Sequence, residues 1–232
     1  MSPIDSSAQL ATIQEKVVSC RLCPRLVEWR EAVARKKRAS YSEEEYWGRP
    51  VPAFGDPGGR LLVVGLAPAA HGANRTGRMF TGDRSGDWLY RALFRAGFAS
   101  QPESTGRHDG LTLSDCLITA AVRCAPPENK PTPPERDSCR TFLEDEIRLL
   151  SQVQVMVALG KFAFDQLWRI LKGCGETLPS PRSRFGHGLE VAVRSDLTLL
   201  ASFHPSQQNT FTGKLTEEMF DGIWLRAKEL LS

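Results

Sequence analysis

Six cysteines stand out because their spacing suggests chemistry. Cys20 and Cys23 are separated by two residues, and Cys124 and Cys139 are separated by fourteen. In an intracellular chain, thiols spaced in this way are more typical of metal ligands than of disulfides. Four thiolates suit tetrahedral zinc and an iron-sulfur cluster equally well. The spacing leaves both metals open, together with the alternative that all the cysteines are free, mostly buried thiols.

A polar loop with four glycines spans residues 72–86. Its backbone can approach a ligand closely, and its N–H groups are available to an anion. The loop matches neither the dinucleotide-binding nor the P-loop pattern. Phe80 is a large aromatic residue in this polar context, so it is either a packing anchor or a platform for a flat ring. Asp83 is either the cap of a following helix or a catalytic acid.

Two histidines follow apolar runs directly. His204 precedes Pro205 at the end of one run, and His71 lies after another. A histidine in this position can donate a hydrogen bond to developing negative charge, or it can satisfy a turn. His108 and His187 have neighbours typical of solvent-exposed or turn residues.

The apolar pattern predicts the scaffold that must position these residues. Continuous apolar runs predict strands buried on both faces, as in a parallel sheet, at residues 61–66, 117–122, 153–159 and 197–203. Amphipathic stretches predict helices at residues 85–96, 133–150, 161–171 and 216–231. The alternation is typical of a doubly wound α/β sheet.

Local signals support this scaffold and locate its binding edge. Thr132, Pro133 and Glu135 predict a capping box at the start of the second helix. In doubly wound sheets, ligands bind in the crevice beyond the carboxyl ends of the strands. We therefore expect the loops that follow the first, second and last strands to converge, and to hold the chemistry.

The composition bounds the class of protein. The chain has 232 residues, 41% hydrophobic and 25% charged, which favours one globular domain over residues 1–232. The longest apolar stretch, Leu61 to Ala70, is about half of the roughly 20 residues that a membrane span needs. The N-terminal residues lack the layout of a signal peptide. We therefore expect a soluble cytoplasmic protein without a membrane partner.

The distribution of charge is more informative than its sum. The net charge of +3 does not by itself imply nucleic acid. Basic residues concentrate at 21–38 and 60–95, and both segments flank the predicted crevice. A basic rim beside a site for a flat ring indicates a nucleic-acid base that enters from a phosphate-bearing strand. A solvated helix face remains the alternative for the first segment.

Four ordered motifs resemble the uracil-DNA glycosylase superfamily, specifically its type b branch, also called family 5. They are GLAPAAHG at 65–72, GRMFTGD at 77–83, RCAPPENKP at 123–131 and HPS at 204–206. The resemblance extends from Cys20 to His204. It implies a three-layer α/β/α sandwich around a four-stranded parallel sheet, with an iron-sulfur-stabilised N-terminal segment. It also implies that a structural [4Fe-4S] cluster is ligated by Cys20, Cys23, Cys124 and Cys139.

The resemblance further implies a DNA-repair enzyme that works on chromosomal DNA in the cytoplasm. Such an enzyme hydrolyses the N-glycosidic bond of uracil and other deaminated bases, such as hypoxanthine, in double-stranded DNA and leaves an abasic site. Phe80 would stack on the flipped base, and His204 would donate to the base oxygen that gains charge. No lysine is evident for lyase chemistry, and nothing demands more than a monomer. The alternatives are a catalytically weak nucleic-acid-binding member and a zinc-stabilised nucleotide hydrolase.

Three positions depart from the pattern of other branches. Leu66 and Ala67 stand where relatives carry a water-positioning Glu or Asp, which leaves Asp83 and Asn129 as the nearest polar candidates. Ala120 stands where type a enzymes place an Asn that reads the uracil edge. Because hydrogen bonds to the base edge reject wrong rings more strongly than pocket shape does, this loss predicts relaxed selectivity.

The remaining assignments follow from position within the motifs. Base contacts are expected from Gly65, Ala67, Ala69, His71 and Ala120. DNA contacts are expected from Arg75, Arg78, Ser206, Gln207, Gln208 and Asn209. The last three of these follow His-Pro-Ser directly and are expected to wedge into the duplex, with a plain polar turn as the alternative.

Overall fold

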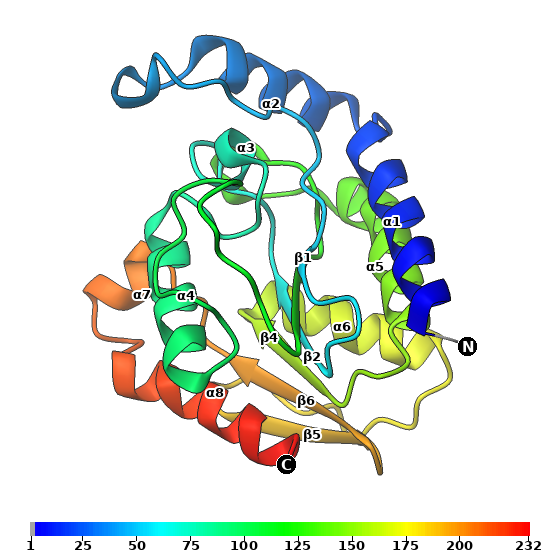
Figure 1. Cartoon of the computed structure of the whole chain (residues 1–232). Coiled ribbons are helices and arrows are strands. Elements are labelled where there is room, and N and C mark those ends of the chain that lie inside the picture. Colours follow the sequence, from blue (N-terminus) through cyan, green and yellow to red (C-terminus); the bar gives the residue numbers. More distant parts are fainter. Residues whose placement is uncertain (1–2) are drawn as a thin grey trace.

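The computed structural model describes residues 3–232 and is organised around one mixed sheet (Figure 1). Four parallel strands form its centre: β3 (Cys116–Ala120), β2 (Leu61–Gly65), β4 (Val155–Leu159) and β6 (Leu197–Ser202). They lie in that order, so the predicted parallel strands are confirmed. Val63 pairs with Ile118 on one side and with Val157 on the other.

The expected number of four strands was too low, because two antiparallel strands extend the sheet to six. Strand β1 (Phe54–Gly55) pairs with β3, and β5 (Leu189–Arg194) pairs with β6. Strand β1 has only two residues, which are too few to show a periodic pattern of apolar residues in the sequence. In β5, buried Val191 and Val193 alternate with exposed neighbours. That period of two is typical of an edge strand with one solvated face, which the search for continuous apolar runs passed over.

Helices cover both faces of the sheet. On one face lie α4 (Arg84–Ala96) and α8 (Glu217–Leu230). On the other face lie α5 (Pro133–Leu149) and α6 (Lys161–Gly173), with α1 (Pro3–Ser19) packed on α5. Successive residues of β2 serve the two cores in turn, since Val63 belongs to the first cluster and Val64 to the second. The expected three-layer α/β/α architecture is thus present.

The start of α5 is as the sequence predicted. The Thr132 side chain accepts a hydrogen bond from Glu135 N, and the Glu135 carboxylate accepts one from Thr132 N at 2.7 Å. Pro133 occupies the first turn, where its missing N–H costs nothing.

The two N-terminal helices lie in different parts of the fold, and α1 packs on α5. Helix α2 (Pro24–Lys36) follows α1 and extends above the carboxyl edge of the sheet, and a short 3₁₀ helix, η1 (Ala39–Tyr41), follows it.

No helix within residues 3–232 is both long and apolar enough to cross a membrane.

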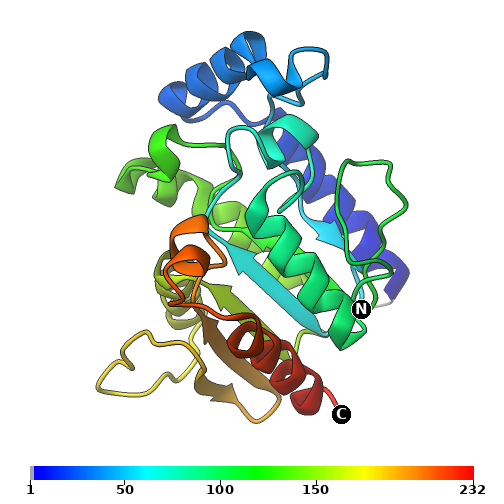
Figure 2. The ribbon, with the colours of Figure 1, turned by 90° about the vertical axis from the view of Figure 1, so that its left-hand side faces the viewer.

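The carboxyl edge carries the irregular connections that the sequence predicted. Three short elements follow parallel strands there: α3 (Ala73–Thr76) after β2, η2 (Pro127–Asn129) after β3, and α7 (Gln207–Phe211) after β6 (Figure 2). The helices that pack on the two faces of the sheet leave this edge open beside α2 (Figure 1), so a ligand can reach it.

Candidate active site

A pocket of about 550 Å³ opens at the carboxyl edge, within the size range of small-molecule sites. The structure brings together most of the predicted site residues. Those that line the pocket are Ala67, Ala69, Phe80, Asp83, Ala120, Asn129, His204, Ser206, Gln207 and Gln208. Sequence reasoning missed Met79, Arg84 and Ser85 as lining residues.

We call this hollow the base pocket, after the expectation from the sequence. Phe80 forms one of its walls and has a strained backbone conformation. Its φ of 52° lies in the left-handed region, which is costly for a bulky residue and is often found at functional sites. Two glycines accommodate it. A Cβ on Gly65 would lie 2.7 Å from the Phe80 ring, and one on Gly86 would lie 1.8 Å from the Phe80 carbonyl oxygen. Gly65 therefore admits the Phe80 ring and does not itself line the pocket.

His204 faces Phe80 across the pocket, with 5.9 Å between the ring centroids and 30° between the ring planes. Burial lowers the pKa of His204 to about 4, so the imidazole is neutral at physiological pH. The ring nitrogens form no hydrogen bond with any residue in 3–232, which leaves them for a ligand. The site thus offers an aromatic face and a neutral N–H donor a few ångströms apart.

Asp83 has the capping role that the sequence allowed. It is the N-cap of α4, and its carboxylate accepts a hydrogen bond from Gly86 N at 3.0 Å. Burial raises its pKa, although the backbone N–H groups of Gly86 and Ser85 oppose the shift. Asp83 is also the single carboxylate among the described residues that line the pocket. The two roles proposed for it are therefore compatible.

Asn129 lies at the rim of the pocket. Its φ of 56° is in the left-handed region, which Asn tolerates better than most residues. Its backbone N donates to Pro126 O at 3.2 Å, and its side chain is exposed. The inner wall beside it carries Leu66, Ala67 and Ala120, so no amide or carboxylate replaces the groups that other branches have there.

The predicted DNA contacts of Arg75 and Arg78 are wrong, because both side chains are buried. Arg78 is 4% exposed, donates to Ser104 Oγ at 2.6 Å and forms an ion pair with Asp109. Arg75 is 7% exposed, donates to His71 O at 2.9 Å and pairs with Glu44. These arginines hold the loop in shape from inside and cannot reach a phosphate.

Asn209 and His71 also lie differently from the prediction. Asn209 Nδ2 donates to His204 O at 2.9 Å, so this side chain braces the site and does not point outward as a wedge. His71 Nδ1 lies 3.0 Å from the hydroxyl of Tyr46, outside the base pocket. Desolvation lowers the pKa of His71, and Arg38 and Arg75 add to the shift.

A shallow groove continues outward from the base pocket. The two hollows share Asp83, Arg84, Asn129 and Gln207, and the groove adds Trp29, Arg38, Tyr41 and His71. Arg84 is exposed and lies 4.1 Å above the ring of Phe211, which is itself 63% exposed. A residue directly after a cap is an ordinary helix position, so no sequence signal marked Arg84. The groove offers cations and aromatic faces beside the pocket mouth.

A second pocket brings the four predicted metal ligands together. Cys20, Cys23, Cys124 and Cys139 line it, between the α1–α2 junction and α5. Burial raises the pKa of Cys124 to about 11 and that of Cys139 to about 12. Among residues 3–232, however, no three His, Cys, Asp or Glu side chains are placed closely enough to hold a metal ion.

Hydrogen-bond donors surround the sulfur atoms of this cysteine pocket. Arg30 Nη1 lies 2.9 Å from Cys124 Sγ, and the backbone N of Arg123 lies 3.2 Å from Cys139 Sγ. Both arginines are almost fully buried and line the pocket. Arg30 Nε and the Nε and Nη1 atoms of Arg123 are buried without a hydrogen-bond partner. Unpaired buried donors are costly, so these atoms fit an anionic group held by the thiols.

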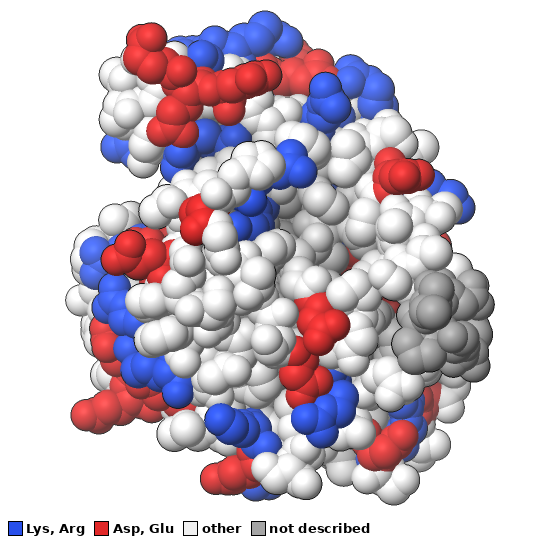
Figure 3. Space-filling model, viewed as in Figure 1, with Lys and Arg blue, Asp and Glu red and all other residues white. Residues whose placement is uncertain are grey.

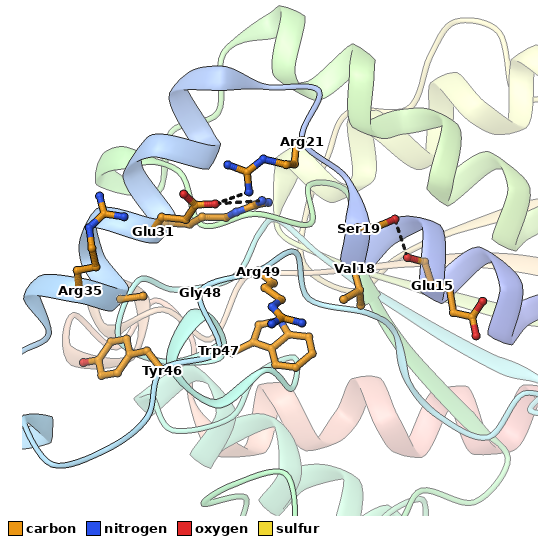
Figure 4. Close-up of a pocket in the computed structure, with 12 residues that line it drawn as sticks. Glu15, Val18, Ser19, Arg21, Glu31, Arg35, Tyr46, Trp47, Gly48 and Arg49 are labelled. Atoms are coloured by element: carbon orange, nitrogen blue, oxygen red, sulfur yellow. Dashed lines mark hydrogen bonds and ion pairs between the residues drawn. The ribbon is translucent and has the colours of Figure 1, made fainter.

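Another hollow, of about 640 Å³, lies between α1, α2 and residues 46–49 (Figure 4). Glu31 pairs there with Arg21 at 2.5 Å, and Arg49 lies 5.5 Å above the Trp47 ring. None of the predicted catalytic or base-contacting residues lines it. The face of the molecule seen in Figure 3 carries charges of both signs, interspersed. The base pocket therefore remains the candidate site.

Comparisons with known proteins identify a family and several relatives of this chain. Residues 52–228 match the family model described as the uracil DNA glycosylase superfamily. The chain is 54% identical over 212 residues to a type-5 uracil-DNA glycosylase of Mycobacterium tuberculosis, covering 91% of this chain and 78% of the relative. Proteins of the same name are 50% identical in Mycobacterium leprae (97% and 96% covered) and 51% identical in Thermus thermophilus (93% and 95% covered).

Proposed function

Because the chain belongs to the uracil DNA glycosylase superfamily, we propose that it hydrolyses the N-glycosidic bond of uracil in DNA and leaves an abasic site. The observation that carries the proposal is the pairing of Phe80 with His204 across one pocket. A pocket of this depth cannot be reached by a base stacked in a duplex, so the base is flipped out of double-stranded DNA.

Phe80 and His204 have different roles toward the flipped base. The Phe80 ring offers a stacking surface. The neutral His204 imidazole donates a hydrogen bond to the uracil oxygen that gains negative charge as the bond to the sugar breaks. A donor held ready at developing charge is worth about 3 to 4 kcal/mol of barrier where such donors have been deleted. Because the pKa of His204 is low, the group stabilises the leaving anion by a hydrogen bond and does not protonate it.

Bond cleavage leaves an oxocarbenium-like sugar, which a water molecule attacks. Water adds its oxygen to the sugar carbon and releases a proton, and the departing base keeps the bonding electron pair. We assign the orientation of this water to Asp83, the carboxylate at the pocket, with the Asn129 amide at the rim as its alternative. A strongly dissociative cleavage needs only a weak base, which fits a carboxylate already shared with a helix cap.

The apolar inner wall supports activity on further deaminated bases. Ala67, Ala69 and Ala120 contribute only small apolar side chains. Without an amide that reads the ring edge, a hypoxanthine ring loses no specific partner there relative to uracil. The same wall favours a second candidate, a DNA-binding protein with weak catalysis, since Leu66 and Ala67 supply no water-positioning acid.

The groove beside the pocket supports contact with the DNA strand around the flipped nucleotide. Exposed Arg38 and Arg84 supply cations for phosphates, and Trp29 and Phe211 supply exposed aromatic faces. Ser206, Gln207 and Gln208 lie at the pocket mouth, and both glutamines are exposed. We propose these two glutamines as the wedge that fills the space left by the base, in a complex of one protein chain with one duplex.

We also propose that the cysteine pocket holds a [4Fe-4S] cluster, as the donor set supports. Four thiolates around a cluster give a net negative charge, which the buried donors of Arg30 and Arg123 would compensate. Bound there, the cluster supplies a structural cross-link and no electron to the hydrolysis. Its thiolates would tie the α1–α2 junction to β3 and α5, and so fix α2 beside the groove.

The test is excision from a labelled duplex with one uracil opposite guanine, in excess EDTA, followed by alkali. Strand breaks that require alkali are the expected result for a glycosylase without lyase activity. Loss of the breaks in His204→Ala, with DNA binding retained, ties them to this pocket. DNA binding without excision of uracil or hypoxanthine would favour the second candidate.

A further inference from the structure

The orientation of the His204 imidazole in the base pocket depends on the backbone before and after this residue. The imidazole itself bonds to no described residue, so nothing fixes it directly. On one side, Asn209 Nδ2 donates to His204 O at 2.9 Å. On the other side, the backbone N of Phe203 donates to Nδ1 of His187 at 3.2 Å. Asn209 thus holds the peptide that follows His204, and His187 holds the Ser202–Phe203 peptide, one residue before the peptide that precedes it.

His187 lies in the segment between α6 and β5, and it bridges two other parts of the fold. Its Nε2 lies 3.1 Å from Met219 O in α8, while its Nδ1 meets the end of β6. The ring also packs on Phe203, with 5.3 Å between centroids. His187 is a turn residue, as the sequence indicated, but its half-buried ring packs between α8 and the strand that delivers His204, which the sequence did not predict.

The hydrogen bonds fix the protonation of His187. The backbone N–H of Phe203 can only donate, so Nδ1 must carry no proton. Met219 O can only accept, so Nε2 must carry one. The ring is therefore the neutral tautomer with its proton on Nε2, a donor at one end and an acceptor at the other. Burial also lowers the pKa of His187, although the bond to Met219 opposes this shift.

We propose that His187 is a positioning residue for His204, in which the neutral ring clamps the Phe203 peptide between α8 and β6 and so sets the angle at which the His204 imidazole enters the base pocket. The inference rests on the proposed function, since it takes His204 as the donor to the leaving base. Gly160 leaves room for this backbone, because a Cβ at that position would lie 3.2 Å from the Cβ of His204.

Two variants of His187 separate positioning from bulk. His187→Leu keeps an apolar side chain and removes both hydrogen bonds, whereas His187→Gln keeps one acceptor and one donor. We expect His187→Leu to slow single-turnover excision at least tenfold, on the order of the loss from a misplaced catalytic group. Binding of a duplex with uncleavable 2′-fluoro-2′-deoxyuridine should stay within about twofold, and His187→Gln should recover most of the rate. Exposed His108→Leu is the matched control.

Equal slowing of the Leu and Gln variants, or a wild-type rate in His187→Leu, would overturn the proposal. A second measurement does not depend on catalysis or on a variant that folds. Imidazole ¹⁵N chemical shifts of the wild-type protein at neutral pH should show His187 neutral and protonated on Nε2. A proton on Nδ1 would overturn the clamp even if excision is normal. A wild-type protein that shows the expected tautomer but excises no deaminated base would instead overturn the proposed function.

Discussion

The base pocket and the cysteine pocket lie on neighbouring parts of the same edge but differ in what they lack. In the base pocket, no charge is left uncompensated without a ligand: His204 is neutral, and the Asp83 carboxylate caps α4. In the cysteine pocket, by contrast, Arg30 Nε and the Nε and Nη1 atoms of Arg123 are buried without a hydrogen-bond partner. The residues of the base pocket therefore need no bound group in order to fold, which suits a ligand that binds transiently. The cysteine pocket indicates a resident group that belongs to the fold.

The largest expected effect comes from the thiols. Cys124→Ser should remove absorbance near 400 nm and iron from the purified protein, because the pocket then loses a cluster ligand and the sulfur atom that accepts from Arg30 Nη1. Most of the chain should fail to fold or should melt far below the wild type. The control is Cys174→Ser, which removes an exposed cysteine outside the pocket. A colourless, iron-free wild type that melts like Cys124→Ser would break the comparison, because the second pocket would then need no resident group.

His204→Ala should have the largest effect on catalysis with the fold intact. Removing one donor at developing charge costs about 10²–10³-fold in kcat. Because the imidazole bonds to no described residue, its removal should leave the melting temperature near that of the wild type. Single-turnover excision and calorimetry measure the two quantities, and exposed His108→Ala serves as control. A variant as active as the wild type would show that the pocket acts through another group.

These contrasts show what the sequence could predict. Phe80, Asp83 and His204 were found because each follows a recognisable strand or precedes a helix, and topology sends all such positions to one edge. The directions of side chains were not predictable. Arg75 and Arg78 stand among glycines in a basic segment, yet each turns inward to an acid 31 residues away, Glu44 or Asp109.

Side-chain partners at the far end of the sheet were equally unpredictable. His187 stands between two glycines, which indicates a turn, and only the tertiary packing places its ring against β6 and α8. Asn209 follows a motif whose position suggested DNA, but its amide reaches back to His204 O. Local pattern predicts which edge carries chemistry, whereas partners far apart in the chain decide which face of a loop is presented.

Arg84 and Arg78 test that distinction between outward and inward arginines. Arg84→Met should weaken binding to a uracil-containing duplex by about 1 kcal/mol and reduce the slope of log K against log salt by about one, as loss of one phosphate contact does. Stability should hardly change, since Arg84 is exposed. Arg78→Met, by contrast, should lower stability by about 3 to 5 kcal/mol, because Asp109 loses its charged partner and is left with the backbone N–H groups of Thr105, Gly106 and Leu111. Fluorescence anisotropy across a salt series measures the first effect, and chemical denaturation measures the second. An unchanged salt slope in Arg84→Met would remove Arg84 from the DNA interface.

The last expected effect concerns pH and follows from the burial of His204 in the base pocket. The pKa of His204 is about 4 in the folded chain against 6.5 for the ordinary group, so the unfolded state binds the extra proton first. The contribution of His204 to stability is therefore full above pH 6.5 and is lost as pH falls from 6.5 towards 4. Melting temperatures between pH 7.5 and 5 should fall less in His204→Gln than in the wild type, because Gln does not titrate. Excision by the wild type should show no loss of rate from His204 between pH 7.5 and 5.5, since the donor stays neutral over that range. A rate that tracks a group titrating near pH 6.5 would mean that His204 is exposed to solvent in the working enzyme, and the pocket would then resemble an open surface more than a prepared site.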